Sequence, residues 1–246
     1  MNMEQRFVKI SYTGRVKDGP VFDTTDADTA KKENIFDQKR VYQAVPMVIG
    51  ELQVLQGLDE ALAEMKAGDE KELDIPAEKA YGQKDPALIR LVPMKIFKQQ
   101  NMMPVPGMVI ELDGRPARIQ TVSGGRVRVD FNSELAGKTL SYKIKITEEA
   151  NTPAEKVKYL IERSFNTSEG FIEKISGKAI DITVPEKSYR DRNIFVRKAS
   201  LAAEIYKYTE IEEATFIESW KKKKKGDVIV AESEEDLEEA IEESME

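Results

Sequence analysis

The stretch MVIGELQVLQGLDEALAEMKAGD, residues 47–69, predicts a strand followed by a helix and decides much of the fold. Its first three residues are apolar and are followed by a glycine, as is typical of a short buried strand. Leu58, Leu62 and Met65 then recur at helical spacing, so we expect an amphipathic helix that Gly68 closes.

Segments on both sides of this stretch predict further strands. Residues 7–12 alternate between apolar and polar side chains, which is the pattern of a half-buried strand. Asp26 is a candidate cap for a short exposed helix that extends to about Asn34. Residues 73–75 alternate in the same one-sided way, and residues 140–146 resume that pattern after a long interruption.

The interruption itself has the signals of a small β-rich domain. Residues 108–112, 115–121 and 126–131 read as three strands, and Asp113-Gly114 is a hairpin signal between the first two. A structureless loop of this length inside a compact domain would be unusual. We therefore expect residues 86–137 to form an inserted domain.

The last hundred residues predict a separate α/β unit. Thr152-Pro153-Ala154-Glu155 is a capping box that starts a helix. Residues 180–184 and 214–220 read as strands, and residues 194–206 read as a second helix. Beyond them we expect a short strand at residues 228–230 and a final acidic helix with Leu237 and Ile241 one turn apart. No reaction centre is evident in this unit.

Composition excludes several classes of chemistry. The chain has no His and no Cys, which removes thiol nucleophiles, Ser-His catalysis and the usual transition-metal ligands. The net charge of −7 argues against a general nucleic-acid binder, although the basic run Lys221 to Lys225 admits either that role or a solvated edge. The sequence shows no secretion signal and no membrane span, so we expect a soluble, cytoplasmic protein without cofactor or metal.

Candidate chemistry therefore rests on aromatic and apolar side chains beside a few polar ones. Taken singly, each suits a hydrophobic core as well as a binding site, because Tyr12, Leu58 and Tyr142 occupy core-facing positions of strands or a helix. Their order and spacing along the chain favour a site. The candidates are Tyr12, Phe22, Asp23, Met47, Val54, Leu55, Leu58, Tyr81 and Tyr142.

These residues lie in ordered motifs that closely resemble the FKBP family of prolyl isomerases over about residues 5–149. The motifs are Tyr12-Thr13-Gly14, Val21-Phe22-Asp23, Met47-Val48-Ile49-Gly50, Val54-Leu55-Gln56-Gly57-Leu58-Asp59-Glu60-Ala61-Leu62, Met65-Lys66-Ala67-Gly68-Asp69 and Ala80-Tyr81-Gly82. Leu88-Ile89 resembles the apolar pair of the family's flap, which would add both residues to the pocket. The resemblance implies an α+β fold in which a half-barrel antiparallel sheet packs over one helix.

The resemblance also implies roles for individual residues. The Tyr81 hydroxyl would hold a substrate carbonyl oxygen, and Asp23 would polarise the near rim of the pocket. Tyr142, Leu55 and Leu58 would enclose the proline ring. Two departures concern the pocket itself: Leu58 stands where the family often has Trp, and Met47 stands where Phe is common.

The insert and its return, Leu135-Ala136-Gly137-Lys138-Thr139-Leu140, are similar to the SlyD branch, whose members carry an insert-in-flap chaperone domain. Here Asn132-Ser133-Glu134 lacks the His that this branch frequently has, and the chain lacks the residues of SlyD's nickel-binding tail. The helix after Asp23 and the C-terminal extension resemble archaeal long-chain FKBPs.

The insert is rich in Met, an adaptable side chain suited to unfolded segments. The same residues could instead build the core of the small domain, and we expect some to do each. The client-binding candidates are Met94, Ile96, Phe97, Met102, Met103, Val105 and Met108.

The sequence thus predicts an isomerase domain at residues 1–85 and 138–150, an insert at 86–137 and a C-terminal α/β domain at 151–246. The expected function is peptidyl-prolyl cis-trans isomerisation coupled to capture of unfolded protein chains. Two alternatives are a holdase with little turnover and a scaffold that recruits a partner through residues 151–246. An apolar stripe on the 194–206 helix and the lone Trp220 either belong to the core of that domain or form a homodimer interface, and we expect a homodimer through residues 151–246.

Overall fold

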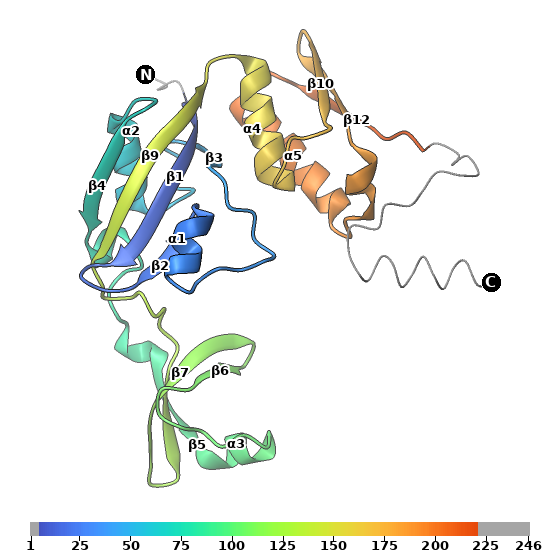
Figure 1. Ribbon diagram of the computed structural model, residues 1–246. Coiled ribbons are helices and arrows are strands. Elements are labelled where there is room, and N and C mark those ends of the chain that lie inside the picture. Colours follow the sequence, from blue (N-terminus) through green and yellow to red (C-terminus); the bar gives the residue numbers. More distant parts are fainter. Residues whose placement is uncertain (1–4, 221–246) are drawn as a thin grey trace, which may run out of the picture.

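A computed structural model describes residues 5–220 (Figure 1). The basic run at residues 221–225, the expected strand at 228–230 and the expected acidic helix lie outside the described residues. The described chain forms three units, each built around its own sheet, which we call the N-terminal unit, the insert and the C-terminal unit.

The N-terminal unit is a five-stranded antiparallel sheet in the order β2-β1-β9-β4, with β3 paired to the other part of β1. Its two longest strands, β1 and β9, pair along their whole length, so their paired residues point to the same faces of the sheet (Figure 1). The strands are β1 (Phe7–Val16), β2 (Val21–Thr24), β3 (Val45–Val48), β4 (Glu70–Ile75) and β9 (Leu140–Ala150).

One helix, α2 (Gln56–Glu64), packs its apolar side against this sheet. Leu58 and Leu62 of α2 are buried with Ile10, Ile144 and other apolar residues of β1 and β9, and we call this group the sheet core. The short helix α1 (Ala27–Lys32) follows β2 and is capped by Asp26, as expected, through a 2.7 Å hydrogen bond from the Thr29 amide.

The predicted end of the long helix was wrong. Instead of continuing to Gly68, α2 stops at Glu64, and Met65 is already extended. The reason is local: the Asp69 carboxylate accepts a 2.9 Å hydrogen bond from the Lys66 amide and closes a turn there. Gly68 serves that turn with a φ of +91°. Met65 still reaches the sheet core.

The insert has a separate sheet in the order β5-β8-β7-β6. The three strands expected from the sequence are present, whereas β5 and the short helix α3 were not foreseen. Its elements are η2 (Pro86–Leu88), β5 (Ile89–Pro93), α3 (Met94–Gln99), β6 (Val109–Leu112), β7 (Arg115–Ser123) and β8 (Arg126–Asp130). Its buried cluster, from Phe97 to Phe131, contains residues of the insert alone.

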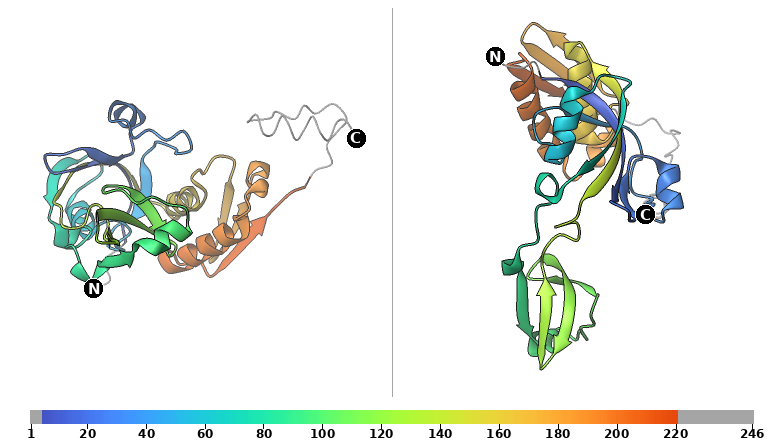
Figure 2. Two further views of the ribbon diagram at one scale, coloured as in Figure 1. Left: turned by 90° about the horizontal axis from the view of Figure 1, so that it is seen from below. Right: turned by 90° about the vertical axis from the view of Figure 1, so that its left-hand side faces the viewer.

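Two chain segments connect the insert to the rest of the molecule, and the insert projects away from the sheet of the N-terminal unit (Figure 2). Asn132 joins the two segments. Its side-chain oxygen accepts a 2.9 Å hydrogen bond from the Asp85 amide, and its amide nitrogen donates to the Asp85 carbonyl oxygen at 3.0 Å. The Gly137 amide also donates to the Gly82 carbonyl oxygen at 2.8 Å.

The C-terminal unit begins with the expected capping box at Thr152 and Glu155. Its sheet has the order β10-β11-β12, with β12 parallel to β11, and β10 was not foreseen. The elements are α4 (Pro153–Phe165), β10 (Ile172–Ser176), β11 (Ala179–Thr183), η3 (Glu186–Arg190), α5 (Ile194–Tyr208) and β12 (Glu213–Ile217).

The C-terminal unit and the N-terminal unit share one hydrophobic core. Phe7, Val48 and Ala150 come from the N-terminal sheet, and they are buried in one cluster with Leu160 of α4 and Leu201 of α5. Because neighbouring strand residues point to opposite faces, Val8 enters the sheet core while Phe7 enters this shared core. The mixed architecture of antiparallel sheets and few helices agrees with the expected α+β class. In residues 5–220, no helix is long and apolar enough to cross a membrane.

Candidate active site

Three aromatic rings from three strands of the N-terminal unit meet over the sheet core. Tyr12 of β1 lies 6.1 Å from Tyr142 of β9, centroid to centroid, and Phe22 of β2 meets Tyr142 edge-on at 5.9 Å. Gly14 permits this approach, because a Cβ at its position would lie 2.7 Å from the Tyr142 ring and 3.0 Å from Phe22. The Tyr-Thr-Gly motif therefore needs its glycine for ring packing.

Apolar candidates surround these rings. Met47 and Leu58 are buried in the sheet core, and Val54 and Leu55 are half-buried against it. Leu55 is the residue immediately before α2, so the start of the helix brings it to the same place as Leu58. The fold thus gathers Tyr12, Phe22, Met47, Val54, Leu55, Leu58 and Tyr142 in one group.

A carboxylate with two firm partners stands at the edge of this group. The Tyr12 hydroxyl donates a 2.8 Å hydrogen bond to Asp23 Oδ2, and Arg40 Nη1 donates to Asp23 Oδ1 at 2.6 Å. Arg40 comes from the segment between α1 and β3 and was missed in the sequence, because that segment has no periodic pattern. An arginine flanked by Phe36 and Tyr42 was the available signal.

Burial and charge keep the two pocket phenols protonated. Burial, with help from the hydrogen bond to Asp23 and its charge, raises the pKa of Tyr12 to about 12, although Arg40 opposes the shift. Burial also raises the pKa of Tyr142, and the nearby Tyr81, Tyr12 and Asp23 add to that effect. Both hydroxyls therefore stay protonated, and able to donate a hydrogen bond, to a higher pH than an ordinary tyrosine. Burial alone would lower the pKa of Arg40, but the hydrogen bond and charge of Asp23 outweigh it and raise that pKa.

Three further candidates from the sequence lie apart from the sheet core. Tyr81 is 45% exposed and follows a short 3-10 turn, η1 (Ala77–Lys79), near enough to Tyr142 to influence its pKa. Leu88 packs against the insert's own core, and Ile89 begins β5 opposite Asp130. The structure does not bring Leu88 or Ile89 into the sheet core with the three rings.

The client-binding candidates divide into two groups. Phe97 is fully buried, and Met94 and Met102 pack beside it in the insert's core. The exposed group is Ile96, Met103, Val105 and Met108, with Met103 at 85% exposure. Sequence reasoning missed Leu91 and Val109, which are also exposed: β5 was not foreseen as a strand, and Val109 is an outward residue of β6.

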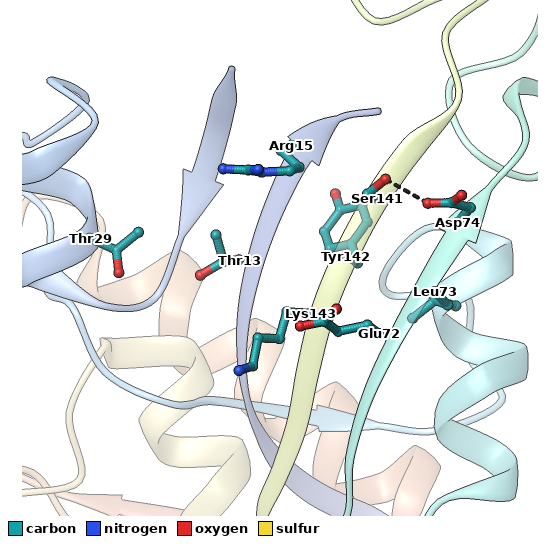
Figure 3. A pocket seen from close by; sticks show the side chains of 9 residues that line it. All are labelled: Thr13, Arg15, Thr29, Glu72, Leu73, Asp74, Ser141, Tyr142 and Lys143. Atoms are coloured by element: carbon teal, nitrogen blue, oxygen red, sulfur yellow. Dashed lines mark hydrogen bonds between the residues drawn. The ribbon is translucent and has the colours of Figure 1, made fainter. Parts of the chain in front are cut away.

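A large cleft on the sheet of the N-terminal unit, which Tyr142 also lines, differs in character from the aromatic group (Figure 3). It measures about 590 Å³ and is lined chiefly by polar side chains of β1, β4 and β9, among them Arg15, Asp74 and Lys143. Two of its charged groups already have partners: Ser141 donates to Asp74 at 2.5 Å, and Lys143 pairs with Glu70 at 2.7 Å. The aromatic group with Asp23 is the better candidate site.

The aromatic group can bind and orient a ligand, but it has no arrangement for covalent catalysis. Its polar atoms are phenols, one paired carboxylate and one guanidinium, and both Asp23 oxygens are occupied. Residues 5–220 contain no cluster of three or more His, Cys, Asp or Glu that could hold a metal ion. Apolar walls with a few fixed donors suit a reaction that changes the shape of a bound group.

Family comparisons match all three units. A family described as FKBP-type peptidyl-prolyl cis-trans isomerase matches residues 2–98. A family described as FKBP26, IF domain, matches residues 90–135, and one described as FKBP26_C-terminal matches residues 153–221.

Individual relatives carry the same activity in their names. A short-type peptidyl-prolyl cis-trans isomerase of Methanocaldococcus jannaschii is 38% identical over 142 residues, which cover 58% of this chain and 90% of that protein. A probable FKBP-type 16 kDa peptidyl-prolyl cis-trans isomerase of Pseudomonas fluorescens is 32% identical over 41% of this chain and 69% of that protein. The FKBP-type isomerase SlyD of Helicobacter pylori is 29% identical over 46% of this chain and 63% of that protein.

Proposed function

The chain belongs to the family of FKBP-type peptidyl-prolyl cis-trans isomerases, and we propose that it isomerises X-Pro bonds of unfolded protein chains that its insert captures. The observation that supports this active site is the packing of Tyr12, Phe22 and Tyr142 over the sheet core, with Asp23 held at the edge of the three rings.

The chemistry needs only differential binding. Rotation about a prolyl amide removes its resonance and has a barrier of about 18–20 kcal/mol. At mid-rotation the carbonyl is less polar and needs less hydration, so apolar walls stabilise the twisted amide relative to the planar one. Each ~1.4 kcal/mol of this preference gives about tenfold in rate. Neither a nucleophile nor a base is required.

The pocket residues have matching roles in this proposal. Tyr142, Leu55 and Leu58 enclose the proline ring, and the Tyr81 hydroxyl, exposed at the rim, donates to a substrate carbonyl oxygen. Asp23 polarises the near side of the pocket from a fixed position. A positioning role suits Asp23 better than proton transfer, because Tyr12 and Arg40 already occupy its two oxygens.

Client capture is assigned to the exposed apolar side chains of the insert. Ile96, Met103, Val105 and Met108 provide a pliable surface that is not consumed by the insert's core. Such a surface suits segments of varied sequence. It would raise the local concentration of X-Pro bonds beside the pocket.

Assays on two substrates separate this function from a holdase. We expect turnover on a short X-Pro peptide and faster catalysis on an unfolded protein whose refolding is limited by proline isomerisation. The substitution Met103→Ser should reduce only the protein reaction. Ile172→Ser, which removes another exposed apolar side chain, one from the C-terminal unit, is the matched control. A holdase would bind the protein without accelerating the peptide reaction.

A second proposal concerns the C-terminal unit, through which we infer a homodimer. The stripe expected on the 194–206 helix is largely open to solvent, with Phe195 at 77% exposure and Tyr206 also exposed, and Trp220 beyond β12 is exposed as well. Leu201 and Ile205, on another side of α5, fill the shared core instead. Light scattering should report about twice the 27.9 kDa chain mass. A monomer at tens of micromolar would exclude the dimer.

A further inference from the structure

Arg40 reaches Asp23 from a segment that has no helix or strand, residues 33–44 between α1 and β3. Contacts around one ring hold this loop together. Phe36 stacks on Tyr42 at 5.2 Å between centroids, and the Arg40 guanidinium lies 5.4 Å from the Tyr42 centroid. The Asp37 amide donates to the Tyr42 hydroxyl at 2.9 Å. We therefore expect Arg40 and Tyr42 to move together as one rigid segment.

Gln43, which follows Tyr42, links this segment of the loop to the C-terminal unit. Its side-chain nitrogen donates to Glu162 Oε1 and to the Asn166 carbonyl oxygen, each at 3.4 Å, at the end of α4. Beside this link, a cleft of about 290 Å³ separates much of the loop from α4, lined by Arg40 and Gln43 on one side and by Arg163 on the other. Gln43 thus spans this cleft with side-chain hydrogen bonds, just ahead of β3, which packs against α4 through Val48.

The acceptor on α4 is itself fixed. Glu162 is buried, and its Oε2 accepts an ion pair from Lys9 Nζ of β1 at 2.9 Å. Lys9 lies on the same strand as Tyr12, the other partner of Asp23. The ion pair with Lys9 therefore fixes Glu162 relative to β1, the strand that contains Tyr12. The hydrogen bond from Gln43 to Glu162 then fixes the loop that contains Arg40 relative to the same strand.

We propose that Gln43 is a positioning residue for isomerisation, through which α4 of the C-terminal unit holds Arg40 against Asp23. The loop would otherwise sample several conformations, because residues 33–44 have no strand or helix ladder to fix them. Anchoring Gln43 restricts the loop before a substrate arrives. The C-terminal unit thereby contributes to turnover without touching the substrate. This inference rests on the proposed assignment of Asp23 to the active site.

The test measures kcat/KM on a short X-Pro peptide in the full chain. Loss of one such hydrogen-bonded anchor is expected to lower kcat/KM about threefold in Gln43→Ala. Gln43→Lys keeps a long donor facing Glu162 and should restore most of that loss. Gln38→Ala is the matched control, because Gln38 lies in the same loop, is exposed, and makes no side-chain hydrogen bond in the described structure.

A second arm distinguishes positioning from a general effect on folding. In an Arg40→Ala background, Gln43→Ala should cause no further loss, since its only route to the site has been removed. Unchanged turnover in Gln43→Ala, an equal loss in Gln38→Ala, or a full additional loss in the Arg40→Ala background would each overturn the inference. If the wild-type chain itself lacked peptide turnover, the proposed function would fail first and this inference with it.

Discussion

The insert and the C-terminal unit are both additions to the same sheet, yet they are attached in opposite ways. The insert encloses its own core around Phe97 and meets the N-terminal unit through two connecting segments (Figure 2). The C-terminal unit completes a core that the N-terminal sheet began with Phe7, Val48 and Ala150. An addition with its own core can be removed or can move, whereas one that shares a core becomes part of the unit it joins.

This difference suits the proposed division of labour. A client-binding insert gains from independence, because it must accept clients of varied shape and bring them to the pocket. The C-terminal unit shares a hydrophobic core with the sheet that carries the pocket, and it reaches the loop that carries Arg40. Its attachment suits a part that stabilises the site.

The largest expected effect comes from one substitution made on each side of the comparison. Phe7 and Phe97 are both almost fully buried, so Phe7→Ala and Phe97→Ala should each cost about 3–5 kcal/mol of local stability. Phe7→Ala should lower hydrogen-exchange protection in the N-terminal and C-terminal units together. Phe97→Ala should lower it in the insert alone and leave peptide turnover intact. Loss of protection throughout the chain in Phe97→Ala would contradict the independence of the insert.

Deletion of residues 86–137, bridged by a short loop, should separate the two substrates. Catalysed refolding of a protein client should fall roughly a hundredfold, because the insert no longer concentrates the client beside the pocket. Turnover of a short peptide should stay within about threefold of the full chain. An equal loss of turnover on both substrates would show instead that the insert forms part of the pocket. Leu88 and Ile89, the apolar pair expected at the flap, would then be the residues responsible.

A smaller effect is expected from alkaline pH. The pKa of Tyr12 is raised to about 12 in the folded chain, above the ordinary value near 10 in the unfolded chain. The unfolded state therefore loses this proton first, and the stabilising contribution, complete below pH 10, is lost as the pH rises from 10 to 12. Peptide turnover should be level from pH 6 to 10 and decline only as the pH approaches 12, because the folded chain keeps the Tyr12 proton until then. Tyrosinate absorbance should contain a phase near pH 12 that Tyr12→Phe removes; a Tyr12 phase near pH 10 would contradict the burial argument.

Local pattern was enough to predict most of the strands and helices. Alternation in β1 and β9 gave one apolar face, and the capping box at Thr152 gave the start of α4. The burial of Phe7 could not be read in the same way, because Lys9 and Ser11 follow it on that face and, apart from Val48, its buried neighbours in the shared core come from more than 140 residues away. Shared cores form from distant contacts that leave no periodic signal.

The site was predictable where it consists of side chains on regular elements. Tyr12, Phe22, Leu58 and Tyr142 converge because their strands and helix do. Arg40 was missed for the opposite reason, since a loop fixes its residues through individual contacts such as Arg40 with Tyr42. The short α3 was missed because one turn and a half of helix is too brief for a 3.6-residue period.

The central claim, that the aromatic group with Asp23 is where prolyl bonds rotate, is tested most directly by peptide turnover in two variants. Asp23→Ala and Tyr142→Leu should each lower kcat/KM at least tenfold, about 1.4 kcal/mol of transition-state binding, with circular dichroism unchanged. Asp181→Ala and Tyr189→Leu, the same substitutions made in the C-terminal unit, should leave turnover close to wild type. Wild-type turnover in both pocket variants, with the fold intact, would move the reaction to another part of the molecule.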